Sequence, residues 1–127
     1  MTTSSPRRIL VVEDEYLLAD DLRKLLDREG ATVVGPVATE ADALALLEDG
    51  TVDCAILDIN LRGRMVYPLA HTLRDRHVPF LFVSGYDDPD PSAGFDDVEL
   101  IQKPFAPETV IRGINRLTEQ AAERVAS

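Results

Sequence analysis

The stretch RILVVEDE, residues 8–15, contains the first regular element and indicates the class of fold. Its four consecutive apolar residues, Ile9 to Val12, are typical of a strand that is covered on both faces. Two acidic residues, Glu13 and Asp14, follow this run directly. Further short apolar runs predict four more strands, at residues 32–38, 52–58, 79–83 and 97–102.

Helical periodicity separates these runs. Leucines at positions 18, 22, 25 and 26 predict an amphipathic helix over residues 15–29, and Gly30 is a suitable stop. Thr39 is a candidate N-cap for the next helix, and Pro68 fits the first turn of another. The predicted helices after the first span 40–49, 68 to about 77, and 107 onward. Residues 87–96, with two prolines, a glycine and four aspartates, are poor helix material.

The order of elements predicts an α/β fold with a doubly wound, five-stranded parallel sheet. Alternating strands and helices give a parallel sheet with helices on both faces, and right-handed crossovers favour the strand order 2-1-3-4-5 of flavodoxin-like folds. Pro36 places the second strand at an edge, since proline cannot donate to a ladder. The fourth helix is expected to be short or disordered, because residues 87–96 occupy its place.

Length and charge restrict the class of protein. The 127 residues indicate one domain, expected at 8–123 between a flexible tail at 1–7 and a C-terminal tail at 124–127. The net charge of −10 argues against nucleic acid and anionic membrane surfaces as partners. No apolar run is long enough to span a bilayer or to act as a signal core, so a cytoplasmic protein is expected. The single cysteine, Cys54, is interpreted as a buried hydrophobe.

Five polar residues lie at the carboxyl ends of four predicted strands, beside the point between the first and third strands where the strand order reverses. They are Glu13, Asp14, Asp58, Ser84 and Lys103. Ligands bind at this point in doubly wound sheets, so we expect the five side chains to share one crevice. Each residue alone has an ordinary explanation as a helix cap, a turn former or a solvated charge, and only their convergence indicates a site.

Three carboxylates in one crevice require a proton or a cation. Mg²⁺ suits oxygen ligands and bridges to phosphate, with Asp14 and Asp58 as candidate direct ligands and Glu13 acting through a water. Phosphoryl transfer also needs positive charge on the phosphoryl oxygens, which Mg²⁺ and Lys103 would supply. Asp58 is the candidate nucleophile, forming an acyl phosphate, and Ser84 is a candidate hydrogen-bond donor to it.

Four motifs carry a family resemblance: LVVEDE, AILDINL, FLFVSGY and QKPF, at residues 10–15, 55–61, 80–86 and 102–105. In this order and spacing they resemble the CheY-like receiver domain of two-component response regulators, over residues 9 to about 117. The resemblance implies that Asp58 accepts a phosphoryl group from a histidine kinase. It implies Mg²⁺ held by Asp14, Asp58 and the backbone carbonyl of Asn60, with Glu13 assisting.

The resemblance also implies that Ser84 and Lys103 are the switch residues and that the Lys103–Pro104 bond is cis. The segment FVSGY (82–86) is similar to the single-domain subgroup known as FATGUY. Many receivers have an aromatic switch residue three positions before the lysine, where this chain has Leu100, and Tyr86 is the candidate to replace it. Output is then expected through a downstream protein or phosphotransfer partner, or as a phosphate sink, from a monomer or weak dimer that is not itself an enzyme.

Two alternatives remain open from the sequence. The first is a protein-binding module that uses the same fold and is never phosphorylated. The second is a small hydrolase with Asp58 as nucleophile, although Asn60 occupies the place where a second acid is expected. A metal site at His71 and His77 is disfavoured, because residues six apart do not share a helix face.

Overall fold

The computed structural model describes residues 7–85 and 94–126, with residues 120–126 as helical backbone only. Its main sheet has five parallel strands in the order β2-β1-β3-β6-β7, which confirms the predicted topology and the edge position of the second strand. The strands are β1 (Arg8–Val12), β2 (Thr32–Val37), β3 (Cys54–Asp58), β6 (Phe80–Ser84) and β7 (Leu100–Gln102).

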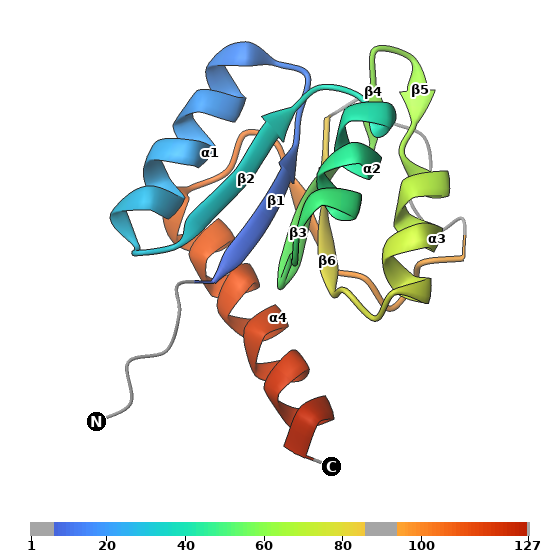
Figure 1. The fold of residues 1–127 in the computed structure, drawn as a ribbon. Coiled ribbons are helices and arrows are strands. Elements are labelled where there is room, and N and C mark those ends of the chain that lie inside the picture. Colours follow the sequence, from blue (N-terminus) through green and yellow to red (C-terminus); the bar gives the residue numbers. More distant parts are fainter. Residues whose placement is uncertain (1–6, 86–93, 127) are drawn as a thin grey trace.

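Within the described residues, four helices cover the two faces of this sheet (Figure 1). They are α1 (Tyr16–Arg28), α2 (Glu40–Asp49), α3 (Tyr67–Asp75) and α4 (Pro107–Ala126). The Thr39 hydroxyl accepts from the backbone N–H of Asp42 at 3.1 Å, as its predicted role as N-cap requires. Helix α3 ends two residues earlier than predicted, before His77 adopts a left-handed φ of 60°. Helix α4 continues into the predicted tail at 124–127 and reaches Ala126.

The sheet separates two hydrophobic cores. Helices α2 and α3 pack on one face, where Leu47, Leu69 and Phe82 are buried. Helices α1 and α4 pack on the other, where Leu22 and Ile114 are buried. The strands supply both cores because their side chains alternate between the faces. Asp58 and Ser84, the last residues of β3 and β6, are buried as well but belong to neither core.

Cys54 lies at the start of β3 and is buried, as predicted. Burial raises the pKa of its thiol to about 12, so the side chain stays a neutral thiol near pH 7.

A small antiparallel hairpin follows β3, where the sequence predicted only a loop. It consists of β4 (Asn60–Leu61) and β5 (Arg64–Met65). Its two turn residues, Arg62 and Gly63, have φ values of 53° and 86°, and tight hairpin turns favour such left-handed pairs. The Asn60 side-chain oxygen accepts from the Gly63 N–H at 2.7 Å and closes the turn.

The last strand is shorter than the predicted span of 97–102. Residues 94–99 form turns and irregular chain, and no helix is present among them. The Glu99 carbonyl nevertheless accepts from the Phe82 N–H at 2.9 Å, so pairing with β6 begins just before β7. The predictions for residues 87–93 and for Tyr86 lie outside the described residues. The Lys103–Pro104 bond is cis, as the resemblance implied.

Gly35 forms part of an irregularity in β2 opposite Val11, where the pairing with β1 shifts register. Its φ is +97°, and a Cβ there would lie 2.9 Å from the Val37 nitrogen and 3.1 Å from the Val11 oxygen. We expect Gly35→Ala to lower the free energy of unfolding by ~2 kcal/mol, from left-handed strain and backbone crowding. Urea denaturation measures this. Gly50→Ala is the control, because its added Cβ meets only the flexible end of Arg8; equal losses would contradict the explanation.

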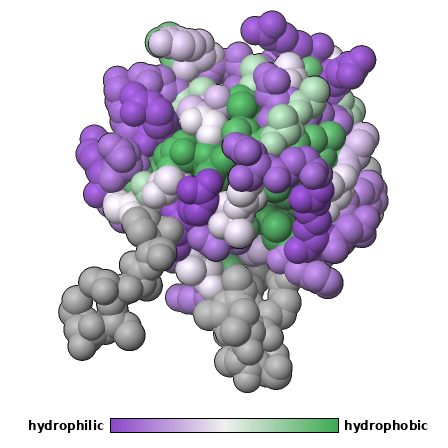
Figure 2. Space-filling view, in the orientation of Figure 1, coloured by the Kyte–Doolittle hydropathy of each residue, from purple (hydrophilic) through white to green (hydrophobic). Residues whose placement is uncertain are grey.

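The surface agrees with the acidic composition. In the orientation of Figure 1 it is mostly hydrophilic, with hydrophobic side chains visible mainly in the middle of the face (Figure 2). Within the described residues, none of the helices has the length and apolar character that crossing a membrane requires.

Candidate functional site

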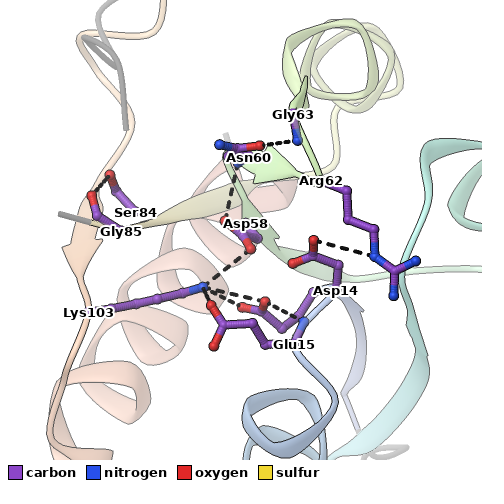
Figure 3. A network of polar contacts seen from close by, with 10 residues as sticks. Asp14, Glu15, Asp58, Asn60, Arg62, Gly63, Ser84, Gly85 and Lys103 are labelled. Carbon is purple, nitrogen blue, oxygen red and sulfur yellow. Dashed lines mark hydrogen bonds and ion pairs between the residues drawn. The ribbon is translucent and has the colours of Figure 1, made fainter. Parts of the chain in front are cut away.

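Four of the five predicted site residues meet at the carboxyl ends of the strands. Glu13 and Asp14 follow β1, Asp58 is the last residue of β3, and Lys103 follows β7. The Lys103 side chain reaches across the end of the sheet toward Asp58 (Figure 3). Its ammonium nitrogen lies 3.3 Å from Oδ2 of Asp58 and 3.2 Å from Oε1 of Glu13. The prediction that these distant residues converge is therefore confirmed.

The ammonium of Lys103 has a third carboxylate partner. Its nitrogen lies 2.9 Å from Oε1 of Glu15, the shortest of its ion pairs. The side chains of Glu13 and Asp58 are only 1% and 3% exposed, whereas that of Glu15 is 63% exposed. Two of the three partners are thus fixed in the protein interior, and one lies in solvent.

Burial determines the protonation of this cluster. Burial, together with the adjacent Asp58 carboxyl, raises the pKa of Glu13 to about 8. Burial also raises the pKa of Asp58, although Glu13 and Lys103 oppose this shift. Desolvation alone would lower the pKa of Lys103, but Glu15, Glu13 and Asp58 outweigh it and raise the pKa, so the ammonium stays charged. The single positive charge of Lys103 is therefore shared among three carboxyl groups, those of Glu13, Glu15 and Asp58.

The acid cluster suits a hard divalent cation. One carboxylate oxygen from each of Glu13, Asp14 and Asp58 lies within 4.8 Å of the others. Oε1 of Glu13 is buried and has no hydrogen-bond donor, although the Lys103 ammonium is within ion-pair distance. Buried carboxylate oxygens are normally paired or coordinate a metal. A donor set of oxygens only fits Mg²⁺ better than zinc or copper.

Asp58 faces a pocket of about 260 Å³. The pocket is lined by Asp14, Glu15, Asp58, Asn60, Arg62, Gly63, Gly85 and Lys103. The other oxygen of Asp58, Oδ1, accepts from the backbone N–H of Asn60 at 3.2 Å. One carboxylate oxygen is thus oriented by the backbone and the other by Lys103, which fixes the plane of the group toward the pocket.

The remaining predicted residues are placed as follows. Ser84 is buried at the end of β6, and its hydroxyl donates to the Gly85 carbonyl at 3.1 Å. Asn60 begins β4 directly beside the acid cluster. Leu100, which stands in place of an aromatic residue, lies partly exposed on β7. Tyr86 falls outside the described residues.

Sequence reasoning missed two residues at the site, Glu15 and Arg62. Arg62, at the tip of the hairpin, reaches toward Asp14, with Nε 3.9 Å from Oδ2 (Figure 3). Glu15 was assigned only to the start of a helix. A signal existed in each case, because Glu15 completes the acidic triplet after β1 and Arg62 lies four residues after Asp58. Neither spacing indicates the direction of the side chain.

A family model for the response regulator receiver domain matches residues 9–115. The chain belongs to this family. Receiver domains are signalling domains of two-component systems rather than a family of catalytic enzymes, and they typically bind Mg²⁺ at an acidic pocket and are phosphorylated. The acid cluster of this receiver domain lies at the carboxyl ends of the strands.

Solved structures and curated proteins agree with this assignment. The solution structure of SdrG from Sphingomonas melonis Fr1 is 42% identical with a TM-score of 0.81, covering 91% of this chain and 98% of that one. The BeF3-activated conformation of SdrG is 40% identical with a TM-score of 0.75, over 91% and 99%. The Escherichia coli (strain K12) aerobic respiration control protein ArcA is 35% identical over 118 residues, covering 87% of this chain and 48% of ArcA. This receiver domain spans about half the length of curated relatives that it matches.

Proposed function

We propose that this receiver domain accepts a phosphoryl group on Asp58 from the phosphohistidine of a histidine kinase. The observation that carries the proposal is the Lys103 ammonium 3.3 Å from Oδ2 of Asp58, at the wall of an open pocket. A transferred phosphoryl group carries negative charge on its equatorial oxygens, and Lys103 is placed to bind one of them. Of the three acids in the cluster, Glu13, Asp14 and Asp58, Asp58 is the one that both contacts Lys103 and lines this pocket.

The transfer is balanced without any further reactant. A carboxylate oxygen of Asp58 forms the new P–O bond, while the P–N bond of the donor breaks and its electron pair leaves with the imidazole. Asn60 and Lys103 hold the carboxylate before attack, so little reorganisation is needed. Mg²⁺, held by Asp14, Asp58 and the Asn60 carbonyl with Glu13 assisting, would neutralise charge on the phosphoryl group when bound.

We further propose that Ser84 and Lys103 move when the phosphoryl group adds negative charge at Asp58, and that this movement shifts neighbouring elements. Tyr86 is a candidate to move with them. We assign residues 8–123 to the domain and place the chain in the FATGUY subgroup, because FVSGY follows the same pattern. In this proposal it acts in the cytoplasm as a monomer or weak dimer, through protein contacts or as a phosphate sink.

The test is phosphorylation by a small acyl phosphate. With Mg²⁺ present, the intact mass of the wild type is expected to rise by one phosphoryl group, and a chelator is expected to prevent this. Asp58→Asn removes the nucleophile and is expected to abolish the gain. Asp53→Asn is the matched control. Asp53 directly precedes β3, at the end of the strand opposite Asp58, and its carboxylate accepts from the backbone N–H of Arg8. An unmodified wild type would refute the proposal and favour the binding-module alternative. An Asp58→Asn protein that still gains phosphate would refute Asp58 as the acceptor.

A further inference from the structure

We propose that Glu15 is a positioning residue that competes for the Lys103 ammonium with the anion bound at Asp58, and so weakens anion binding there. The inference rests on the proposed function, because it concerns the same ammonium. It assigns a role to a residue outside the buried acid cluster. It predicts that the wild-type site binds a phosphoryl group less tightly than the same site would if Lys103 had no contact with Glu15.

All the donors of Lys103 have partners. An ammonium has three N–H groups. The Lys103 nitrogen makes three hydrogen bonds, at 2.9 Å to Glu15, 3.3 Å to Asp58 and 3.4 Å to Glu13. A phosphoryl oxygen that arrives at Asp58 can be bound by this ammonium only if one of these partners withdraws.

Glu15 is the partner that withdraws at the lowest cost. Glu13 is fixed in the interior, where its carboxylate also accepts from the Glu15 N–H at 3.0 Å, and Asp58 is held by Asn60. Leaving either of those buried acids unpaired would be costly. The exposed Glu15 carboxylate can instead turn into water, where an ion pair of this kind is worth little.

The position of Glu15 in its helix gives a second, independent argument. Glu15 is the N-cap residue of α1, a position that favours Ser, Thr, Asp or Asn. Its side chain makes no hydrogen bond to the first turn of the helix. Helix capping therefore does not explain a glutamate here, whereas the contact with Lys103 uses the full length of the side chain.

The experiment measures the affinity of beryllofluoride, an anion that mimics a phosphoryl group, at saturating Mg²⁺. Fluorine NMR titrations of the wild type, Glu15→Gln and Glu15→Ala give the dissociation constants. Glu15→Gln is expected to bind roughly two- to five-fold more tightly than wild type, and Glu15→Ala at least as tightly, from the loss of one exposed ion pair. The gain should shrink near 1 M salt, where the exposed pair is screened.

The matched control is Asp21→Asn. Asp21 is exposed and lines a second pocket, which Lys103 and Glu15 also line. Its carboxylate is not within ion-pair distance of the Lys103 ammonium. Because the proposed competition depends on the ion pair between Glu15 and Lys103, Asp21→Asn should leave the affinity unchanged. All variants should unfold at similar temperatures. Equal tightening in Asp21→Asn would mean a general charge effect and would overturn the proposal, as would unchanged or weaker binding in Glu15→Gln. If even the wild type fails to bind beryllofluoride, the proposed function fails, and this inference with it.

Discussion

Phe95→Ala is expected to lower the free energy of unfolding by ~4 kcal/mol, a loss in the range for large aromatic residues removed from a core. Phe95 is 2% exposed and fills the core between α3 and the sheet. Its ring stacks on Tyr67 with centroids 6.0 Å apart and lies 4.8 Å from the ring of His71. The guanidinium of Arg74 lies 4.6 Å from its centroid. The substitution therefore removes contacts with α3 on several sides and leaves a cavity.

Denaturation in urea, fitted with a common slope, measures this loss. Leu100→Ala is the control, because Leu100 also lies between β6 and α4 in the sequence but is 41% exposed, and it should cost less than ~1 kcal/mol. A loss below 1 kcal/mol for Phe95→Ala would show that residues 94–99 are not anchored to α3 through this ring. The sequence placed Phe95 only at the end of a segment poor in helix formers.

The strands and the convergence of the site could be predicted because both follow from strong rules. Buried parallel strands are continuous apolar runs, and a parallel sheet brings every carboxyl end to one edge. Asp58 and Lys103 are 45 residues apart in sequence, yet their strand positions alone predicted contact. Topology therefore carries long-range information that no local motif contains.

Side-chain direction and short elements could not be predicted in the same way. The hairpin after β3 has strands of only two residues, and Arg62 occupies a left-handed position where Asn or Gly is the usual signal. Glu15 looked like the first residue of a helix, because spacing does not reveal that its side chain turns toward Lys103. The predicted strand at 97–102 has six residues, because Val98 continues the alternation of polar and apolar residues, whereas β7 itself has three. The Glu99 carbonyl already bonds to the Phe82 N–H just before β7 begins.

The charges of the site explain why a cation should stabilise the fold. Glu13, Asp14 and Asp58 are within 4.8 Å of one another, while Lys103 provides the closest positive charge and Arg62 reaches only Asp14, at 3.9 Å. Burial makes the charged forms of Glu13 and Asp58 costly, as their raised pKa values indicate. A ligand that binds only the folded state stabilises it by mass action, and the unfolded chain does not hold these acids together.

Mg²⁺ is accordingly expected to raise the free energy of unfolding, by ~2.7 kcal/mol at a hundredfold excess over its dissociation constant. Removing the metal with a chelator should reverse the gain. Thermal or urea unfolding with and without Mg²⁺ measures it, with Ca²⁺ as a comparison, because a small site with few protein ligands suits the smaller ion.

Asp14→Asn and Asp58→Asn should both lose most of this response, because each removes a charged ligand. Asp58→Asn should in addition be more stable than wild type without metal, since a neutral amide replaces a buried carboxylate whose pKa is raised by burial. Asp53→Asn, at the other end of the strand, should keep the full response. If Mg²⁺ stabilises Asp14→Asn and Asp58→Asn as much as wild type, the ion binds elsewhere. The negative charge of the acid cluster must then be reduced by protonation instead, and Glu13, whose pKa is raised, is the acid that would hold the proton.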